Sequence, residues 1–214
     1  MRKFCWTCHR PAAACFCGQV LEFESSAGFA LIVHPHEVRS TVGTAWIMRR
    51  SISNIKWFRS KGIGLDEDPE FLSLLGAPDA VPLLLFPGPQ AFNLSHGRTE
   101  EWQSLVPAGR RPLFFVVDGT WTEARAMLRK SRLLSALPRV SFETPRLSEY
   151  GFKKQPHPGC LSSVEGVHLV IELLAQRGWG TLPALREHDR MIGIFRNMVR
   201  HQLQQVVTTF WSCR

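Results

Sequence analysis

The 214-residue sequence lacks any long apolar run. No stretch of about 18 consecutive apolar residues occurs, which argues against a transmembrane helix. The first residues, MRKFC, do not resemble the apolar core of a signal peptide. Internal repeats and low-complexity tracts are absent as well. We therefore expect no membrane partner and a cytoplasmic protein, a compartment in which cysteine thiols stay reduced.

Acidic residues are also few in comparison with basic ones. The chain has 26 Lys and Arg residues against 18 Asp and Glu, which gives a formal net charge of +8. This excess favours a polyanionic partner, nucleic acid first, although a basic composition without such a partner gives the same figure. A content of 44% hydrophobic and 21% charged residues is ordinary for a globular chain, long enough for one domain and a small appendage.

Cysteine is scarce outside one short segment. Four of the six cysteines lie within thirteen residues, in the spacing C-x2-C-x6-C-x-C: Cys5, Cys8, Cys15 and Cys17. In a reducing compartment this pattern indicates a tetrahedral zinc site, for which His9 offers a substitute ligand. An iron–sulfur cluster is the alternative. Because four thiolates leave no open coordination position, we expect a structural site in a cysteine knuckle of residues 1–25.

Apolar runs predict strands at 28–37, which runs into a loop, at 81–89 and at 111–120, of the kind that is buried on both faces. A shorter fourth strand is predicted at 138–145. Helical patterns cover 39–52, 67–75, 121–135, 161–177 and 185–206. This alternation predicts that residues 26–214 form one α/β domain with a mostly parallel sheet. Ligands of such sheets bind outside the carboxyl ends of the strands, where we expect the loops 34–37, 86–88 and 118–121.

Two segments match the capping box of a helix start. They are TWTE at 120–123 and SSVE at 162–165, each with a hydroxyl residue at the N-cap and a glutamate three residues later. Asp118 lies before the first of these caps, beside Gly119, which allows a ligand to approach the backbone. Its carboxylate therefore either shapes a turn or belongs to a functional site.

Basic residues follow this acid. Arg125, Arg129 and Arg132 recur at helical spacing, and one face built from them suits phosphate groups, although a solvated basic face has the same pattern. The loop after the fourth predicted strand adds three more cations: Arg146, Lys153 and Lys154. Tyr150 and Phe152 lie among them, either to stack on unpaired bases or to pack the loop onto the core.

Taken together, these motifs resemble the DTW-domain proteins, the tRNA-uridine aminocarboxypropyltransferase family, over nearly the whole chain from Cys5 onward. The motifs in order are the cysteine knuckle with Arg10-Pro11, His34-Pro35-x-Glu37 with Arg39-Ser40-Thr41, Phe86-Pro87, Asp118-x-Thr120-Trp121 with Ala124-Arg125, RLSEY at 146–150, and LSSVE at 161–165. The sequence departs from the family at Val42-Gly43-Thr44, where Asn-Thr-Gly is expected, and at Phe152-Lys153, where Leu-Arg is more usual.

The resemblance implies a SPOUT-like fold that binds S-adenosylmethionine, with helices on both faces of the sheet and a knot near the C-terminus. It implies transfer of the 3-amino-3-carboxypropyl group of S-adenosylmethionine to N3 of a tRNA uridine, with Asp118 as the general base and 5′-methylthioadenosine as the leaving product. The knuckle would hold structural zinc, the partner would be tRNA, and the protein would be a monomer or a homodimer.

The resemblance also assigns the binding residues. Those expected around S-adenosylmethionine are Phe86, Pro87, Gly88, Gly119, Thr120, Trp121, Leu161, Ser162, Ser163 and Glu165. Those expected to contact RNA are Arg39, Ser40, Thr41, Arg125, Arg129, Arg132, Arg146, Lys153 and Lys154. Two alternatives are a SPOUT-type RNA methyltransferase, which would release S-adenosylhomocysteine, and a non-enzymatic zinc-containing RNA-binding protein in which Asp118 only caps a turn.

Overall fold

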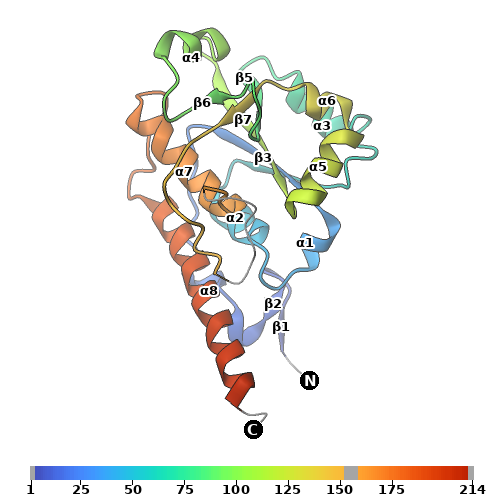
Figure 1. Ribbon diagram of the computed structural model, residues 1–214, viewed down its shortest axis with the longest axis vertical. Helices are drawn as coiled ribbons and strands as arrows, with labels where there is room; N and C mark the ends of the chain where they lie inside the picture. The colour runs from blue at the N-terminus through green and yellow to red at the C-terminus, as the bar shows by residue number, and fades with distance from the viewer. Residues whose placement is uncertain (1–2, 152–158, 212–214) are drawn as a thin grey trace.

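The computed structural model describes residues 3–151 and 159–211 and has a six-stranded parallel sheet at its centre (Figure 1). The strands in chain order are β3 (Gly28–Val33), β4 (Ile55–Arg59), β5 (Ala80–Leu85), β6 (Phe92–Asn93), β7 (Arg111–Asp118) and β8 (Arg139–Ser141). Their order across the sheet is β4-β3-β7-β5-β8-β6, and every neighbouring pair is parallel. The predicted α/β class and mostly parallel sheet are confirmed.

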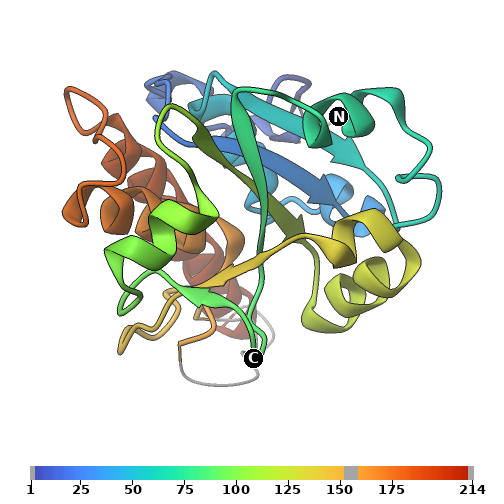
Figure 2. The ribbon, with the colours of Figure 1, turned by 90° about the horizontal axis from the view of Figure 1, so that it is seen from above.

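The central strands β3 and β5 are apolar along their whole length, and β7 is apolar between Arg111 and Asp118, because both faces of the sheet are covered (Figure 2). In β3, Phe29 and Leu31 belong to one hydrophobic core, whereas Ala30 and Ile32 belong to the other. The first core packs against helices α2 (Ala45–Ser51), α4 (Thr99–Leu105), α7 (Ser163–Gln176) and α8 (Glu187–Trp211). The second packs against α3 (Pro69–Leu75), α5 (Trp121–Lys130) and α6 (Arg132–Ala136).

The predicted helix over 39–52 is wrong in its bounds. A short helix, α1 (Pro35–Arg39), begins inside the segment predicted as a loop, with His34 as its N-cap and proline at its first position. The chain then turns before α2 begins at Ala45. Gly43 allows this turn, because an added Cβ would lie 2.9 Å from the carbonyl oxygen of Glu37.

The predicted single helix over 121–135 is also wrong, because the chain breaks between α5 and α6 at Ser131. The Ser131 hydroxyl accepts a hydrogen bond from the backbone N–H of Leu134 at 3.1 Å and so caps α6. The Asp66 carboxylate accepts from the Ser131 hydroxyl and, at 2.8 Å, from the N–H of Arg132. Arg125 and Arg129 therefore lie on one helix and Arg132 begins another, so the three do not share one helical face.

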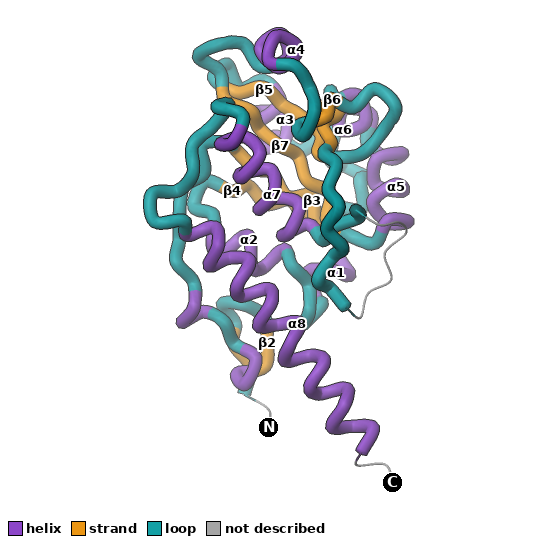
Figure 3. Tube along the Cα trace, turned by 60° about the vertical axis from the view of Figure 1, so that its left-hand side comes forward, coloured by secondary structure: helices purple, strands orange, loops and turns teal. Residues whose placement is uncertain are grey.

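The cysteine knuckle packs against α2 and α8 (Figure 3). It contains β1 (Phe4–Cys5) and β2 (Arg10–Pro11), an antiparallel pair, and two short 3₁₀ turns at Ala12–Ala14 and Cys17–Gln19. Cys8 and Phe16 are buried in the first core, and the buried guanidinium of Arg10 donates to the Gly43 carbonyl at 3.0 Å. The knuckle thus shares the core of the larger domain, and a boundary between residues 25 and 26 stays a prediction.

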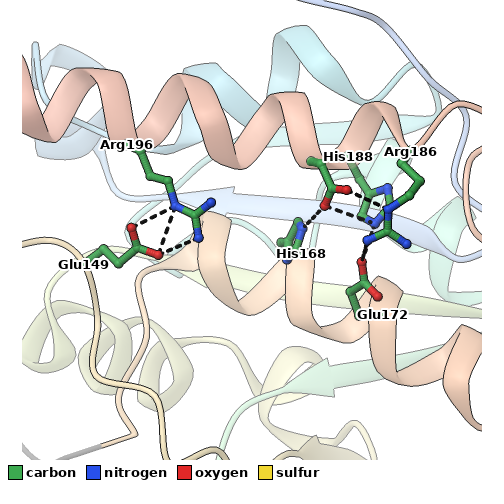
Figure 4. A network of polar contacts seen from close by, with 7 residues as sticks. Glu149, His168, Glu172, Arg186, His188 and Arg196 are labelled. Atoms are coloured by element: carbon green, nitrogen blue, oxygen red, sulfur yellow. Dashed lines mark hydrogen bonds and ion pairs between the residues drawn. The ribbon is translucent and has the colours of Figure 1, made fainter.

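Helices α7 and α8 are joined by a polar network as well as by apolar packing (Figure 4). His168 Nε2 lies 2.9 Å from Asp189 Oδ1, and the buried His188 Nε2 lies 2.8 Å from Glu172 Oε1. Arg186 Nε donates to Asp189 Oδ2 at 2.7 Å and neutralises part of this acidic charge.

In the part of the chain that the structure describes, no helix is both long and apolar enough to cross a membrane.

Candidate functional site

A cavity of about 1150 Å³ opens at the carboxyl ends of β5, β7 and β8. Three segments that are distant in sequence line it, at 86–88, 118–121 and 159–163. Nine of the ten residues predicted around S-adenosylmethionine are in its wall: Phe86, Pro87, Gly88, Gly119, Thr120, Trp121, Leu161, Ser162 and Ser163. This volume is slightly above the range of roughly 300–1,000 Å³ that is usual for the pocket of one drug-sized ligand.

Asp118 is the last residue of β7 and lies in the wall of this cavity. Its side chain is buried, with 4% exposed, because β3 pairs alongside and the His34 N–H donates to the Asp118 carbonyl at 2.8 Å. The buried Thr44 hydroxyl approaches Asp118 Oδ1 at 3.4 Å, a long contact for an O–H···O hydrogen bond. At the next residue, Gly119, an added Cβ would lie 3.3 Å from Glu123 Cβ and 3.4 Å from His34 Cβ, so the glycine allows these side chains to approach the backbone closely.

Tyr150 is buried beside these groups and also lines the cavity. Its hydroxyl donates to the Val42 carbonyl, so the ring packs the 146–150 segment onto the core and offers no face for stacking on RNA bases. Burial first, and then the carboxylates of Glu37 and Asp118, raise the pKa of Tyr150 well above its ordinary value. The phenol is therefore neutral at physiological pH. Phe152, the other aromatic of this loop, lies outside the described residues.

The helix that follows Asp118 starts as the sequence predicts. Thr120 accepts from the Glu123 N–H at 3.3 Å, and Glu123 Oε2 accepts from the Thr120 N–H at 2.9 Å, which completes a capping box. The other carboxylate oxygen, Oε1, lies 3.1 Å from His34 Nδ1 and 2.9 Å from His36 Nδ1. Burial opposes ionisation of Glu123, but the hydrogen bonds from Thr120 lower its pKa. Burial also lowers the pKa of His34, which is therefore neutral near pH 7.

The second capping box positions α7 at the opposite side of the cavity. Ser162 is its N-cap, and Glu165 Oε2 accepts from the Ser162 N–H at 2.8 Å. Glu165 also accepts from the Ser148 hydroxyl and from the Glu149 N–H, both at 2.7 Å, and so ties the RLSEY segment to the start of α7. It is the one residue of the predicted donor-binding set that does not line the cavity. Gly178, with φ +70°, directly follows the C-cap of this helix, Arg177.

Of the predicted RNA-binding residues that the structure describes, one lines the cavity and the others lie outside its wall. Arg125 is exposed and lines the cavity, Arg129 follows one turn later on α5, and the exposed Arg132 lies on α6. Arg39 is exposed on α1 and Ser40 and Thr41 follow it, near the cavity-lining Glu37 and Thr44. Arg146 is exposed in the loop after β8. Lys153 and Lys154 lie outside the described residues.

The wall contains a neighbouring pair of aromatic side chains of the predicted motifs and one arginine that the motifs do not point to. The Phe86 and Trp121 rings lie 5.6 Å apart at an interplanar angle of 55°. The Arg139 guanidinium lies over the Phe86 ring at 5.8 Å. Neither spacing nor periodicity identifies Arg139 in the sequence, because it is one basic residue at the start of a three-residue strand.

The four cysteines of the knuckle converge on one point. The Sγ atoms of Cys5 and Cys17 lie 3.8 Å apart, as do those of Cys8 and Cys15, and all four lie within 4.8 Å of one another. Thiolates bound to one zinc ion at about 2.3 Å in a tetrahedron are about 3.8 Å apart. The cluster can therefore hold one metal ion. His9 is not a member of it and stacks on Trp46 with ring centroids 4.1 Å apart.

The thiols of this cluster differ in acidity. Hydrogen bonds from the backbone of Cys8 and Thr7 lower the pKa of Cys5 to about 6. Burial raises the pKa of Cys8 and of Cys17 above the ordinary value. Several thiolates this close together repel one another unless a cation lies between them, so the arrangement favours a bound metal.

The fold and the cavity define an α/β protein whose ligand site lies at the carboxyl edge of a parallel sheet. A family model described as the DTW domain matches residues 2–203, and the chain belongs to this family. The tRNA-uridine aminocarboxypropyltransferase 2 of Mus musculus is 26% identical over 175 residues, which cover 81% of this chain and 57% of the mouse protein. The relative of the same name from Drosophila melanogaster is 26% identical over 190 residues, 87% of this chain and 70% of that protein. The chain thus spans little more than half the length of the mouse relative, and no solved structure matches it significantly.

Proposed function

We propose that this protein transfers the 3-amino-3-carboxypropyl group of S-adenosylmethionine to N3 of a uridine in tRNA. The observation that carries the proposal is the buried carboxylate of Asp118 in the wall of a cavity of about 1150 Å³. Membership of the DTW family and the names of its relatives support a tRNA substrate. The net charge of +8 and the exposed arginines near the cavity support a polyanionic partner.

The chemistry requires one proton to leave and one bond to be exchanged. Asp118 accepts the proton of uridine N3–H, and the N3 electron pair forms a bond to the γ-carbon of the aminocarboxypropyl group. The bond from that carbon to the sulfonium sulfur breaks, its electron pair stays on sulfur, and neutral 5′-methylthioadenosine leaves. Since an ordinary aspartate has a pKa of about 3.9 and is a weak base, proton transfer must either accompany the attack of N3 or use a carboxylate whose pKa is raised by burial.

The protein's main task in this reaction is positioning, because a sulfonium is already a good leaving group. Gly88 and Gly119 lie in the cavity wall, and Phe86 and Trp121 supply apolar surface for the adenosine part of the donor. Ser162 and Ser163, at the start of α7, face the same cavity from the other side. Arg125 on the rim, with Arg39 and Arg129 outside it, suits the phosphates that flank the target uridine.

The cysteine cluster has a structural role in this proposal. Cys5, Cys8, Cys15 and Cys17 would hold zinc, which cross-links the knuckle and supplies no chemistry to the cavity. The sulfur spacing of 3.8 Å fits one ion better than an iron–sulfur cluster, which inserts several ions between its thiolates. The SPOUT-like character of the fold, a C-terminal knot and a cytoplasmic location stay predictions.

The leaving product separates this function from its two alternatives. The purified protein is incubated with S-adenosylmethionine and unmodified tRNA, and the small products and digested nucleosides are identified by mass spectrometry. We expect 5′-methylthioadenosine and a uridine that carries the aminocarboxypropyl group. S-Adenosylhomocysteine with a methylated base would instead indicate an RNA methyltransferase, and the absence of both products would indicate a binding protein.

Asp118→Asn tests the general base directly. We expect the rate of modification to fall by about 10²–10⁴-fold, the usual contribution of a positioned base, because an amide cannot accept the N3 proton. The affinity for tRNA, measured by filter binding, should stay within about twofold of the wild type because the shape of the side chain is kept. Thr122→Ala, an exposed site on α5, is the control. Full activity of Asp118→Asn would refute the assignment.

A further inference from the structure

The cavity wall contains few positive charges, and they are not equivalent. Arg125 and Arg139 are the arginines among the described residues that line it, with no lysine. Arg125 is exposed on helix α5, at the rim. Arg139 is half-buried and belongs to the sheet, where β8 lies between β5 and β6. Arg139, the more buried of the two, therefore projects from a strand that is hydrogen-bonded on both sides.

The Arg139 side chain lies against the loop that follows β5. Its guanidinium is 5.8 Å above the Phe86 ring, and Nη1 approaches the Pro87 carbonyl at 3.5 Å. Gly88 leaves space for this arrangement, because an added Cβ would lie 2.8 Å from Arg139 Nη1 and 3.2 Å from Cδ. Three neighbouring residues thus contact the Arg139 side chain, and all four residues line the cavity.

The positive charge of Arg139 has no carboxylate partner among the described residues. Other arginines of the protein do have one: Arg98 pairs with Glu101, Arg186 with Glu172 and Asp189, and Arg196 with Glu149. Glu143 also lines the cavity, but its carboxylate pairs with His96 at 3.3 Å and accepts from Asn93 at 3.0 Å. A half-buried guanidinium in an aromatic wall, with open donors and no anion, is suited to bind an anionic group of a ligand.

We propose that Arg139 binds the α-carboxylate of the amino acid part of S-adenosylmethionine. This assignment rests on the proposed function and names the group that orients its donor. A guanidinium and a carboxylate can form two parallel hydrogen bonds, which fixes the direction of the aminocarboxypropyl chain as well as its end. An RNA phosphate suits the exposed Arg125 better, because the RNA backbone approaches from the rim and Arg139 lies deeper, against the 86–88 loop.

The assignment also gives a reason for transferring this group and not methyl. A chain anchored at its carboxylate has a defined γ-carbon position, whereas the methyl group on the same sulfur is not held by any contact of this kind. The carboxylate site thus selects which of the carbons bonded to sulfur faces the acceptor. Loss of the anchor should loosen the choice of transferred group as well as weaken donor binding.

The test compares two arginines and two donors. Equilibrium affinities are measured by calorimetry for wild type, Arg139→Met and Arg125→Met, with S-adenosylmethionine and with its decarboxylated form, which lacks only the carboxylate. We expect Arg139→Met to bind S-adenosylmethionine about 10- to 100-fold more weakly and to bind the decarboxylated form as the wild type does. Arg125→Met should keep wild-type affinity for both donors and bind tRNA more weakly.

The remaining outcomes distinguish failure of the site from failure of the function. Equal affinity of wild type and Arg139→Met for S-adenosylmethionine, or an equal loss with both donors, would overturn the carboxylate assignment while the function stands. A larger effect of Arg139→Met on tRNA than on the donor would overturn it in favour of a phosphate contact. A wild type that binds no S-adenosylmethionine would overturn the function and the site together. Arg139→Lys, which keeps the charge, should recover part of the affinity even if Arg139→Met folds poorly.

Discussion

At the scale of single residues, three carboxylates around the cavity have different tasks because their surroundings differ. Glu123 and Glu165 each complete a capping box and accept hydrogen bonds from backbone N–H groups, so their role in starting a helix accounts for both carboxylates. Asp118 precedes the first cap, is buried, and faces the cavity. The two arginines of the wall differ in a similar way, since the exposed one suits RNA and the half-buried one suits a small anion.

Metal binding by the cysteine cluster also depends on single residues, and Cys8→Ser tests whether the cluster holds zinc. We expect the wild type to contain one zinc per chain by elemental analysis and the variant to contain none. Because Cys8 is buried in the core beneath the knuckle, the melting temperature should fall by at least about 6 °C, which corresponds to about 2–3 kcal/mol for a chain of this size. Cys160→Ser, outside the cluster, should keep the metal. A metal-free wild type that is fully folded would contradict the metal site.

At the scale of elements, contacts between distant segments set bounds that local periodicity does not reveal. The arginine pattern from Arg125 to Arg132 predicts one helix, yet Asp66 and Ser131 together stop α5 and start α6. The carboxylate of Asp66 comes from a loop 65 residues earlier in the chain. Local spacing therefore placed three arginines on one face, whereas a long-range cap divides them between two helices.

Asp66→Ala tests this cap. The substitution leaves the N–H of Arg132 and the hydroxyl of Ser131 without their acceptor, and we expect the free energy of unfolding to fall by about 1–2 kcal/mol. The measurement is urea unfolding followed by far-ultraviolet circular dichroism. Glu67→Ala, an exposed neighbour, should change stability by less than about 0.5 kcal/mol. Equal stability of the two variants would show that the cap is unimportant.

At the scale of the whole molecule, polar contacts reinforce the packing of helices that cover one face of the sheet. The network of His168, Glu172, His188, Asp189 and Arg186 connects α7 to the first turn of α8 (Figure 4). Arg196, further along α8, pairs with Glu149, which is tied to the start of α7 through Glu165. The start of α7 at the cavity and the body of α8 are therefore connected through charged groups.

Stability should consequently fall as the solution becomes more acidic. Burial lowers the pKa of His168 and of His34, so the unfolded chain binds protons first and stability decreases as the pH falls below about 6.5. The pKa values of Glu172 and Asp189 are lowered against the effect of burial by hydrogen bonds, from His188 and Arg186 to Glu172 and from Arg186 and His168 to Asp189. The contribution of these two carboxylates to the stability of the folded state is present above about pH 4.5. It is lost at lower pH, as the folded protein takes up the protons.

The measurement is the free energy of unfolding in urea at a series of pH values between 3 and 8. His168→Gln should reduce the change between pH 7 and 5 because one of the two titrating histidines is removed. Stability that stays constant between pH 7 and 5 in the wild type would contradict this account.

The sequence alone determined the features that depend on neighbouring residues. Continuous apolar runs identified the strands β3, β5 and β7, because a strand buried on both faces has no polar face. The two capping boxes and the cysteine spacing are equally local. The strands β4 and β6 were not predicted, because β4 is an edge strand with exposed charges and β6 has only two residues. The strand-end loops around the cavity followed from the parallel sheet, whose carboxyl ends lie at one edge.

Only the tertiary structure decided which side chains meet and which are buried. It buried Tyr150 against Val42, broke the arginine helix at Ser131, and directed Glu165 to Ser148 and away from the cavity. It also placed the Arg139 guanidinium over Phe86 in the wall of the cavity. The physical reason is the same in each case: burial and pairing depend on residues far away in the chain, and their effect on charge and hydrogen bonding exists only after the sheet and its helices have packed.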